Sequence, residues 1–259
     1  MSFIQQIPGY PRFQNTINNM KMNALYLIFM ALNWIKQKSM KFMDRLVQFS
    51  NCVKQSEIVY FDFETTGLNP YHENIIDYTF LLEETDGEET YIESLVNPET
   101  KFEKVITDIT GIHPEELEEK LTIDNHIPII YHFINANYRK IAHKHVPEVF
   151  MVAHNCDGFD KIFLMRLFED RERYPLVANW KFIDTLPLAK KLLPKLKSHS
   201  MKTLCQHFNI KAGTHRAYSD TVALKKVFHE LVKMLCGIEG ITRSYYLENP
   251  QKIIDYYSF

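Results

Sequence analysis

The chain has 259 residues, a length typical of one α/β domain or two small ones. Hydrophobic residues make up 46% and charged residues 24%, which excludes collagen-like, low-complexity and fully disordered proteins. Four scattered cysteines without C-x-x-C spacing predict neither a disulfide framework nor a zinc knuckle. We therefore expect an intracellular protein of a reducing compartment, cytoplasmic or nuclear. No apolar run reaches the roughly 18–20 residues that a transmembrane span requires.

The net charge of −2 is unevenly distributed along the chain. Residues 62–124 contain 18 Asp or Glu and 3 Lys, whereas residues 1–61 and 125–259 each carry a basic excess. A polyanionic partner would therefore meet the later half of the chain or its N-terminal segment more easily than the acidic segment.

Residues 1–55 are predicted to form a helical N-terminal extension. An apolar run over 24–35 is followed by Lys36, Lys38 and Lys41, where a signal peptide would have a small-residue cleavage site. The run is also too short for a transmembrane helix. Two interpretations remain: a helix that packs on the main domain or on a protein partner through residues 1–50, or a membrane-surface or targeting segment.

The residues that follow have an α/β pattern, and we expect one domain over 56–236 and a C-terminal tail over 237–259. Asp86-Gly87 is a hairpin signal between two of the strands, and Pro114 with the glutamates after it indicates a short helix start. The element order predicts an antiparallel meander followed by parallel crossovers in one mixed sheet. The expected strands are 58–63, 74–83, 90–96, 149–153 and 181–184, and the expected helices are 127–143, 159–169, 200–208 and 218–236.

Asp62 and Glu64 are the first candidate site residues. Strand side chains alternate, so both carboxylates project from the same face of the first strand. They repel each other, and no Lys or Arg occurs between Val59 and Lys101 to relieve the repulsion locally. A divalent cation with a preference for oxygen ligands would relieve it. The alternative is a strand end at which both carboxylates are solvated.

Two further acids begin predicted helices. Asp160 precedes the apolar stripe of Leu164, Leu167 and Phe168, and Asp220 precedes a similar stripe. Each acid could simply cap its helix. His215 lies five residues before Asp220, too far around an ideal helix to share its face, and so would approach from the preceding loop. A loop-borne imidazole suits a general base, although it could equally be a surface histidine.

Together these segments bring four carboxylates to the place where sheet and helices should converge. Such a cluster would be strongly destabilising without a cation, so a two-metal site explains it most simply. In chain order, the motifs are 61–67 (FDFETTG), 109–112 (ITGI), His154-Asn155 leading to Phe159-Asp160, and His215 with Asp220. This combination resembles the DEDDh, or DnaQ-like, 3′–5′ exonucleases over roughly residues 56–236.

The resemblance implies a ribonuclease-H-like fold and hydrolysis of the 3′-terminal phosphodiester to nucleoside 5′-monophosphates. It implies two Mg²⁺ or Mn²⁺ ions, with Asp62 bridging them. Glu64 and Asp220 would hold the ion that carries the attacking water, and Asp160 would support the second ion largely through water. His215 would deprotonate the nucleophile.

The resemblance also implies substrate contacts. The loop residues Thr65, Thr66, Gly67 and Leu68 would contact the terminal nucleotide, and Asn155 would help to position the scissile strand. Three residues separate His154-Asn155 from Phe159-Asp160, where many relatives have two; this spacing resembles that of the three-prime repair exonucleases, whose proline-rich insertion is absent. His113 replaces the Thr of many relatives and either touches substrate or merely precedes a helix start.

The role of the lysines and the choice between cleavage and binding alone remain open at the level of sequence. Lys195 and Lys197 belong to a group of lysines that could follow a phosphate backbone or form a solvated helix face. The expected substrate is a single-stranded 3′ end, with DNA favoured over RNA. All five expected catalytic residues are present, and the alternative is a non-cleaving nucleic-acid-binding or scaffold module on the same fold.

Overall fold

The computed structural model describes residues 57–83, 89–135, 148–169 and 172–258. The N-terminal extension, the Asp86-Gly87 turn and residues 136–143 of the helix expected at 127–143 lie outside the described residues. Among the described residues, no helix has the length and apolar character needed to cross a membrane.

A five-stranded mixed sheet forms the centre of the domain, in the strand order β3-β2-β1-β4-β5. Strand β1 pairs antiparallel with β2 and parallel with β4; β3 continues the meander and β5 the parallel half. The predicted ribonuclease-H-like sheet, a meander followed by parallel strands, is confirmed. The strands are β1 (Glu57–Thr65), β2 (Ile75–Glu83), β3 (Glu89–Leu95), β4 (Val149–Ala153) and β5 (Trp180–Asp184).

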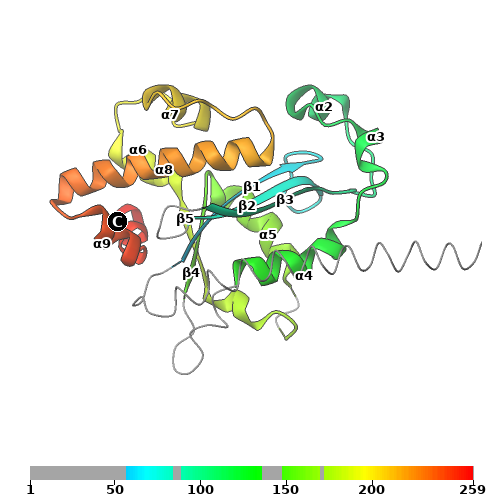
Figure 1. Ribbon diagram of the computed structural model, residues 1–259. Helices are drawn as coiled ribbons and strands as arrows, with labels where there is room; N and C mark the ends of the chain where they lie inside the picture. Colours follow the sequence, from blue (N-terminus) through cyan, green and yellow to red (C-terminus); the bar gives the residue numbers. More distant parts are fainter. Residues whose placement is uncertain (1–56, 84–88, 136–147, 170–171, 259) are drawn as a thin grey trace, which may run out of the picture. The chain divides into compact units, whose positions relative to one another are not determined.

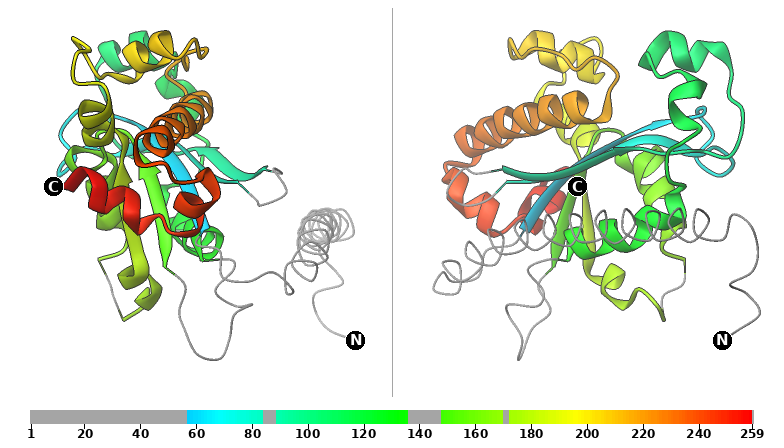
Figure 2. Two further views of the ribbon diagram at one scale, coloured as in Figure 1. Left: turned by 90° about the vertical axis from the view of Figure 1, so that its left-hand side faces the viewer. Right: turned by 45° about the vertical axis from the view of Figure 1, so that its right-hand side comes forward.

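Helices cover both faces of the sheet (Figures 1 and 2). On one face α8 (Ala217–Glu239) lies over β1 and β2, with α6 (Thr185–Leu192) and α7 (Met201–His207) packed against it. On the other face α4 (Ile123–Ile134) and α5 (Asp160–Leu167) pack on a second apolar cluster. The shorter α2 (Lys104–Thr110) and α3 (Pro114–Leu117) follow β3.

The alternation of β1 explains the two cores. Ile58 and Tyr60 pack with α8 in one apolar cluster, whereas Val59 and Phe61 pack with α4 and α5 in the other. Because the even-numbered side chains face α8, Asp62 and Glu64 continue this row toward the first turn of that helix. Burial of the strand on both faces therefore fixes its register, and with it the side on which the two acids emerge.

Three helices differ from the sequence expectation. The helix expected to begin at residue 127 begins at Ile123, so Pro128 lies inside it. Helix α6 was not expected, although Asp184 at its N-cap, which accepts a hydrogen bond from Leu186 N at 2.8 Å, is a standard start signal. Helix α8 continues past the expected boundary at residue 236 and ends at Glu239.

The residues expected to form a C-terminal tail, 237–259, are largely helical and belong to the domain. They comprise the last residues of α8, then α9 (Arg243–Glu248) and α10 (Gln251–Ser258). Tyr246 and Ile253 are buried in the same apolar cluster as α8. Tyr257 Oη accepts a hydrogen bond from Asp184 N at 3.1 Å, which joins α10 to the end of β5.

Candidate active site

The three acids Asp62, Glu64 and Asp220 meet where the end of β1 faces the first turn of α8. One carboxylate oxygen from each of them lies within 4.8 Å of the others. Strand alternation places the first two side by side, and the helix presents the third from across the sheet face. The structure thus brings together residues that are far apart in sequence and were expected to share one site.

Asp160 lies next to this cluster at the start of α5. Its side chain is buried, and a backbone N–H of Phe63 in β1 contributes a hydrogen bond to it. Among the neighbouring charges, that of Asp160 raises the pKa of Asp62 the most, ahead of Glu64 and Asp220. Asp160 is therefore close enough to Asp62 to share an electrostatic site, while remaining outside the three-residue cluster.

Burial and mutual repulsion dominate the electrostatics of these four acids. Loss of hydration is the largest effect at every one of them, followed at Asp62 and Glu64 by neighbouring carboxylates. The pKa of Glu64 rises to about 8, as does that of Asp160, and the pKa of Asp62 rises well above its ordinary value. The protein by itself therefore disfavours the charged state of this site.

The donor set fits a divalent cation. The acids offer only carboxylate oxygens, the ligands that Mg²⁺ and Mn²⁺ prefer. Within the part of the chain that the structure describes, neither Asp62 nor Glu64 forms an ion pair with a Lys, Arg or His. Thr79, directly opposite Asp62 in the β1/β2 ladder, has a buried hydroxyl without a hydrogen-bond partner among the described residues. Protein groups alone leave this site incompletely satisfied.

His215 lies on the loop that enters α8, as expected for a residue that approaches from outside the helix. It is exposed, and its backbone adopts a left-handed conformation with φ of 55°. Its positive form would stabilise the neighbouring charge, since His215 lowers the pKa of Asp220 against the larger effect of burial. The structure thus places an accessible imidazole beside the carboxylate cluster.

The loop around His215 is wrapped tightly onto the first turn of α8. Thr214 N donates to Ser219 Oγ at 2.8 Å, and Arg216 N donates to Asp220 Oδ2 at 3.0 Å. Gly213 packs so closely against Asp220 that a Cβ there would overlap the carboxylate. The conformation of this loop and the position of Asp220 therefore depend on each other.

The loop after β1 contains the residues expected to contact the terminal nucleotide. Thr65 and Thr66 are buried and tie the loop internally: Thr65 Oγ1 donates to Gly67 O at 2.7 Å, and Thr66 Oγ1 donates to Glu73 Oε2. Leu68 is 86% exposed. An apolar side chain held in solvent on a braced loop is available to contact a base.

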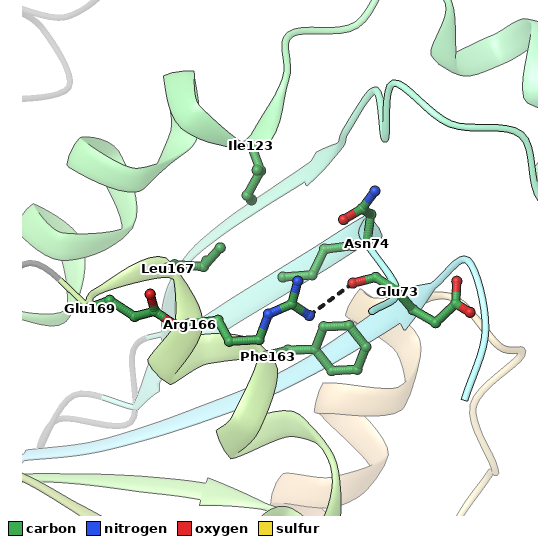
Figure 3. A pocket seen from close by; sticks show the side chains of 8 residues that line it. Glu73, Asn74, Ile123, Phe163, Arg166, Leu167 and Glu169 are labelled. Atoms are coloured by element: carbon green, nitrogen blue, oxygen red, sulfur yellow. Dashed lines mark hydrogen bonds between the residues drawn. The ribbon is translucent and has the colours of Figure 1, made fainter. Parts of the chain in front are cut away.

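Arg166 braces this loop from α5. Its Nη1 donates to Pro70 O at 2.6 Å and to Glu73 O at 3.0 Å. Figure 3 shows the arginine crossing a pocket of about 360 Å³ toward the loop, with Phe163 beneath it. The pocket adjoins Ile75 and helices α4 and α5, so it lies behind the loop and not at the carboxylates.

Asn155 begins the turn that leads from β4 to Asp160. It is exposed and also has a left-handed backbone, with φ of 57°. Asp184 at the end of β5 holds the turn, because its carboxylate accepts from Asp157 N at 3.3 Å. The structure therefore joins Asn155 and Asp160 through one constrained turn.

Lys195 and Lys197 lie on the exposed segment between α6 and α7. They belong to a 35-residue stretch, 185–219, that contains no Asp or Glu. Among the residues that the structure describes, no ion pair joins either lysine to the carboxylate cluster.

Sequence reasoning missed two buried acids next to the site, Asp77 and Asp184. Asp77 interrupts the otherwise apolar start of β2, and Asp184 precedes a helix at the end of a buried strand. In both cases the signal was a charge where the pattern called for an apolar side chain, but the partners are distant in the chain.

Comparison with known proteins identifies the family of the chain. The family model RNase_T, described as Exonuclease, matches residues 59–228, which include all five candidate catalytic residues. The chain belongs to this exonuclease family. It is 31% identical over 196 residues to Exonuclease DPD1, chloroplastic/mitochondrial, of Arabidopsis thaliana, and 32% identical over 201 residues to a DNA polymerase III PolC-type of Thermotoga maritima.

The matches cover different shares of these relatives. The aligned regions are 72% and 76% of this chain but 60% of the Arabidopsis protein and 13% of the Thermotoga polymerase. Among solved structures, E. coli Exonuclease I in complex with a dA16 oligonucleotide is similar with a TM-score of 0.55 and 19% identity, over 71% of this chain and 41% of that one. Exonuclease X in complex with 5′ overhanging duplex DNA gives 0.50 and 20%, over 72% and 95%. These likenesses confirm the predicted exonuclease fold.

The raised pKa values predict how pH and metal act on stability. The Glu64 carboxyl titrates near 8 in the folded, metal-free protein but near 4 when unfolded. Between these two pKa values the folded state holds the proton that the unfolded state has released. The free energy of unfolding is therefore highest below the unfolded pKa and falls as pH rises to the folded pKa. We expect the metal-free melting temperature to fall between about pH 5 and about pH 8, and the increase caused by Mn²⁺ to grow over that interval.

Differential scanning fluorimetry in EDTA and in Mn²⁺ across this interval measures both effects. An Asp62→Asn, Glu64→Gln double variant should flatten both curves, because it removes two of the titrating groups. A wild-type melting temperature that rises with pH in EDTA would contradict the electrostatic description of the site.

Gly213 provides a steric test of the cluster. In Gly213→Ala the new methyl group must displace the Asp220 carboxylate, and we expect Mn²⁺ affinity to fall by roughly 10-fold or more. Isothermal titration calorimetry with Mn²⁺ measures this. Gly237→Ala is the matched control, since the glycine lies in α8 with nothing within 4 Å of an added Cβ. Equal Mn²⁺ affinity in the two variants would show that Asp220 does not depend on this contact.

Proposed function

We propose that this protein is a metal-dependent 3′–5′ exonuclease that acts on single-stranded ends, with DNA favoured over RNA. The observation that carries the proposal is the meeting of Asp62, Glu64 and Asp220, with Asp160 beside them and His215 on the adjacent loop. Support for DNA comes from the similar proteins, which are an exonuclease, a DNA polymerase and two exonucleases in complex with DNA.

The four acids would hold two divalent cations, Mg²⁺ or Mn²⁺. Bound cations supply an acidified water and neutralise charge on the leaving oxygen. Asp62, Glu64 and Asp220 are the candidate ligands closest together, and Asp160, whose charge acts on Asp62, would contribute a further carboxylate. Because burial penalises their charges, these side chains gain most from a cation and bind it in place of protons.

His215 acts as the general base. Its imidazole takes a proton from the attacking water, whose oxygen forms a bond to the terminal phosphorus as the bond from phosphorus to the 3′ oxygen breaks. The products are a nucleoside 5′-monophosphate and a strand shortened by one nucleotide, whose new 3′ oxygen acquires a proton. An exposed position lets His215 pass its proton to solvent between turnovers.

The substrate contacts come from two loops. Thr65, Thr66 and Gly67 form a braced loop end that holds the terminal nucleotide, and Leu68 packs on its base. Asn155, fixed in its turn, positions the strand beside Asp160. Further along the strand, Lys195 and Lys197 attract the phosphates from a stretch free of acids.

The exonuclease proposal predicts a specific product ladder. Wild-type protein should shorten 5′-labelled single-stranded DNA from the 3′ end in Mg²⁺ or Mn²⁺ but not in EDTA, and RNA of the same sequence more slowly. Asp62→Ala should abolish the ladder. Asp108→Ala, an exposed acid on α2 that pairs with Lys104, is the matched control and should be fully active. A folded wild-type protein that binds DNA without cutting it would instead identify a binding module.

The lysine contacts predict a change in salt dependence. If Lys195 and Lys197 each contact one phosphate, Lys→Gln at both should reduce the slope of log affinity against log salt by about 1.4 for a single strand. Fluorescence anisotropy with catalytically inactive Asp62→Ala protein measures the slope. A double Lys→Gln change at Lys233 and Lys252, which pair with acids on the C-terminal helices, should leave it unchanged. An unaltered slope in the first variant would make both lysines solvated bystanders.

A further inference from the structure

Asp77 is a buried acid next to the active site for which the proposed chemistry has no use. It lies in β2 directly opposite Glu64 of β1, so the two side chains share the sheet face that α8 covers. Its charge disfavours the ionised forms of both Asp62 and Glu64. Asp77 therefore makes the ionised state of the cluster less favourable, and we asked which of its contacts offsets this cost.

The partners of Asp77 come from the junction between the His215 loop and α8. Asp77 Oδ2 accepts from Arg216 Nε at 3.0 Å and from Ala217 N at 3.3 Å. The acid thus pairs with a charged side chain and also satisfies a free N–H of the first helical turn. Both contacts span about half the chain and connect β2 to α8 at one point.

Arg216 is consequently held at both its backbone and its side chain. Its N–H donates to the Asp220 carboxylate, and its guanidinium is tied to Asp77. His215, the preceding residue, has a left-handed backbone, a conformation that is uncommon for a non-glycine residue and costs free energy. The exposed His215 is carried by a loop that hydrogen bonds of Thr214, of Arg216 and of its own backbone tie to the first turn of α8. Arg216 adds the side-chain contact that ties this loop to the sheet.

We propose that Asp77 is a positioning residue that acts through Arg216 to hold His215 in its catalytic orientation. The pair is partly open to solvent, with Asp77 7% and Arg216 47% exposed, so its contribution to stability should be modest. This inference rests on the proposed function, since it assumes that His215 is the general base. It adds a residue pair that acts on the proton transfer without touching substrate.

Two single variants separate positioning from electrostatics. Asp77→Asn leaves an extra positive charge beside the acids, and Arg216→Gln leaves an extra negative charge. An effect of charge alone would therefore have opposite signs in the two variants, whereas loss of positioning slows both. At saturating Mg²⁺ we expect single-turnover cleavage of single-stranded DNA to be roughly 10- to 100-fold slower in each, with DNA affinity changed less than about twofold.

The His215→Ala background identifies the residue through which the pair acts. His215→Ala alone should slow the chemical step by roughly 100-fold or more. Adding Asp77→Asn or Arg216→Gln to it should cause little further loss, because there is no imidazole left to position. The matched control is Glu83→Gln, which removes another acid of β2 that pairs with α8, through His229, away from the catalytic end. It should cleave at the wild-type rate.

These measurements decide whether the Asp77–Arg216 pair positions His215. Multiplicative losses in the His215→Ala background, opposite signs in the two single variants, or a wild-type rate in both would overturn the positioning role. A His215→Ala protein with an unchanged single-turnover rate would instead refute the general base, and hence the proposed mechanism. If Asp77→Asn fails to fold, as judged by circular dichroism, the half-exposed Arg216→Gln carries the same test.

Discussion

The gathering of four carboxylates that have lost much of their hydration is the constraint on which the rest of this structure depends. Four acids converge at the end of β1, and burial makes each of them reluctant to ionise. Packing gains from the two apolar cores that flank the sheet compensate for this local cost. The fold can therefore maintain a site that is unfavourable in isolation and becomes favourable when divalent cations replace the protons.

Such a site needs rigid surroundings, because repulsion would otherwise drive the acids apart. Each catalytic segment is held from behind by a contact distant in sequence. Arg166 of α5 fixes the loop after β1, and Asp184 of β5 fixes the turn before Asp160. Helix α10 extends this support, since Tyr257 Oη accepts a hydrogen bond from Asp184 N. The C-terminal residues thus contribute to the framework of the site as well as to the core.

Local pattern was sufficient to single out the candidate acids that the structure brings together, but not the residues that support them. Strand alternation placed Asp62 and Glu64 on one face, and the apolar stripes after Asp160 and Asp220 indicated helices that begin at the sheet. The mixed sheet, a meander followed by parallel strands, followed from the succession of elements. Asp77 was missed because its partner Arg216 lies 139 residues away, and no local periodicity encodes such a pair. The helix expected from residue 127 begins at Ile123, and Pro128 is accommodated inside it.

Cation binding and proton transfer, the two parts of the proposed mechanism, require different exposure to solvent. The position of α8 satisfies both requirements. Asp220 must be withdrawn from water to strengthen its interaction with a cation, whereas His215 must reach water to release its proton. The helix begins between these residues, so its first turn is packed against the sheet while the loop before it projects outward. A loop this close to solvent would sample several conformations if it were unrestrained. The contact from Asp77 to Arg216 anchors it on the buried side, which allows an exposed base to operate beside a partly buried set of proposed ligands.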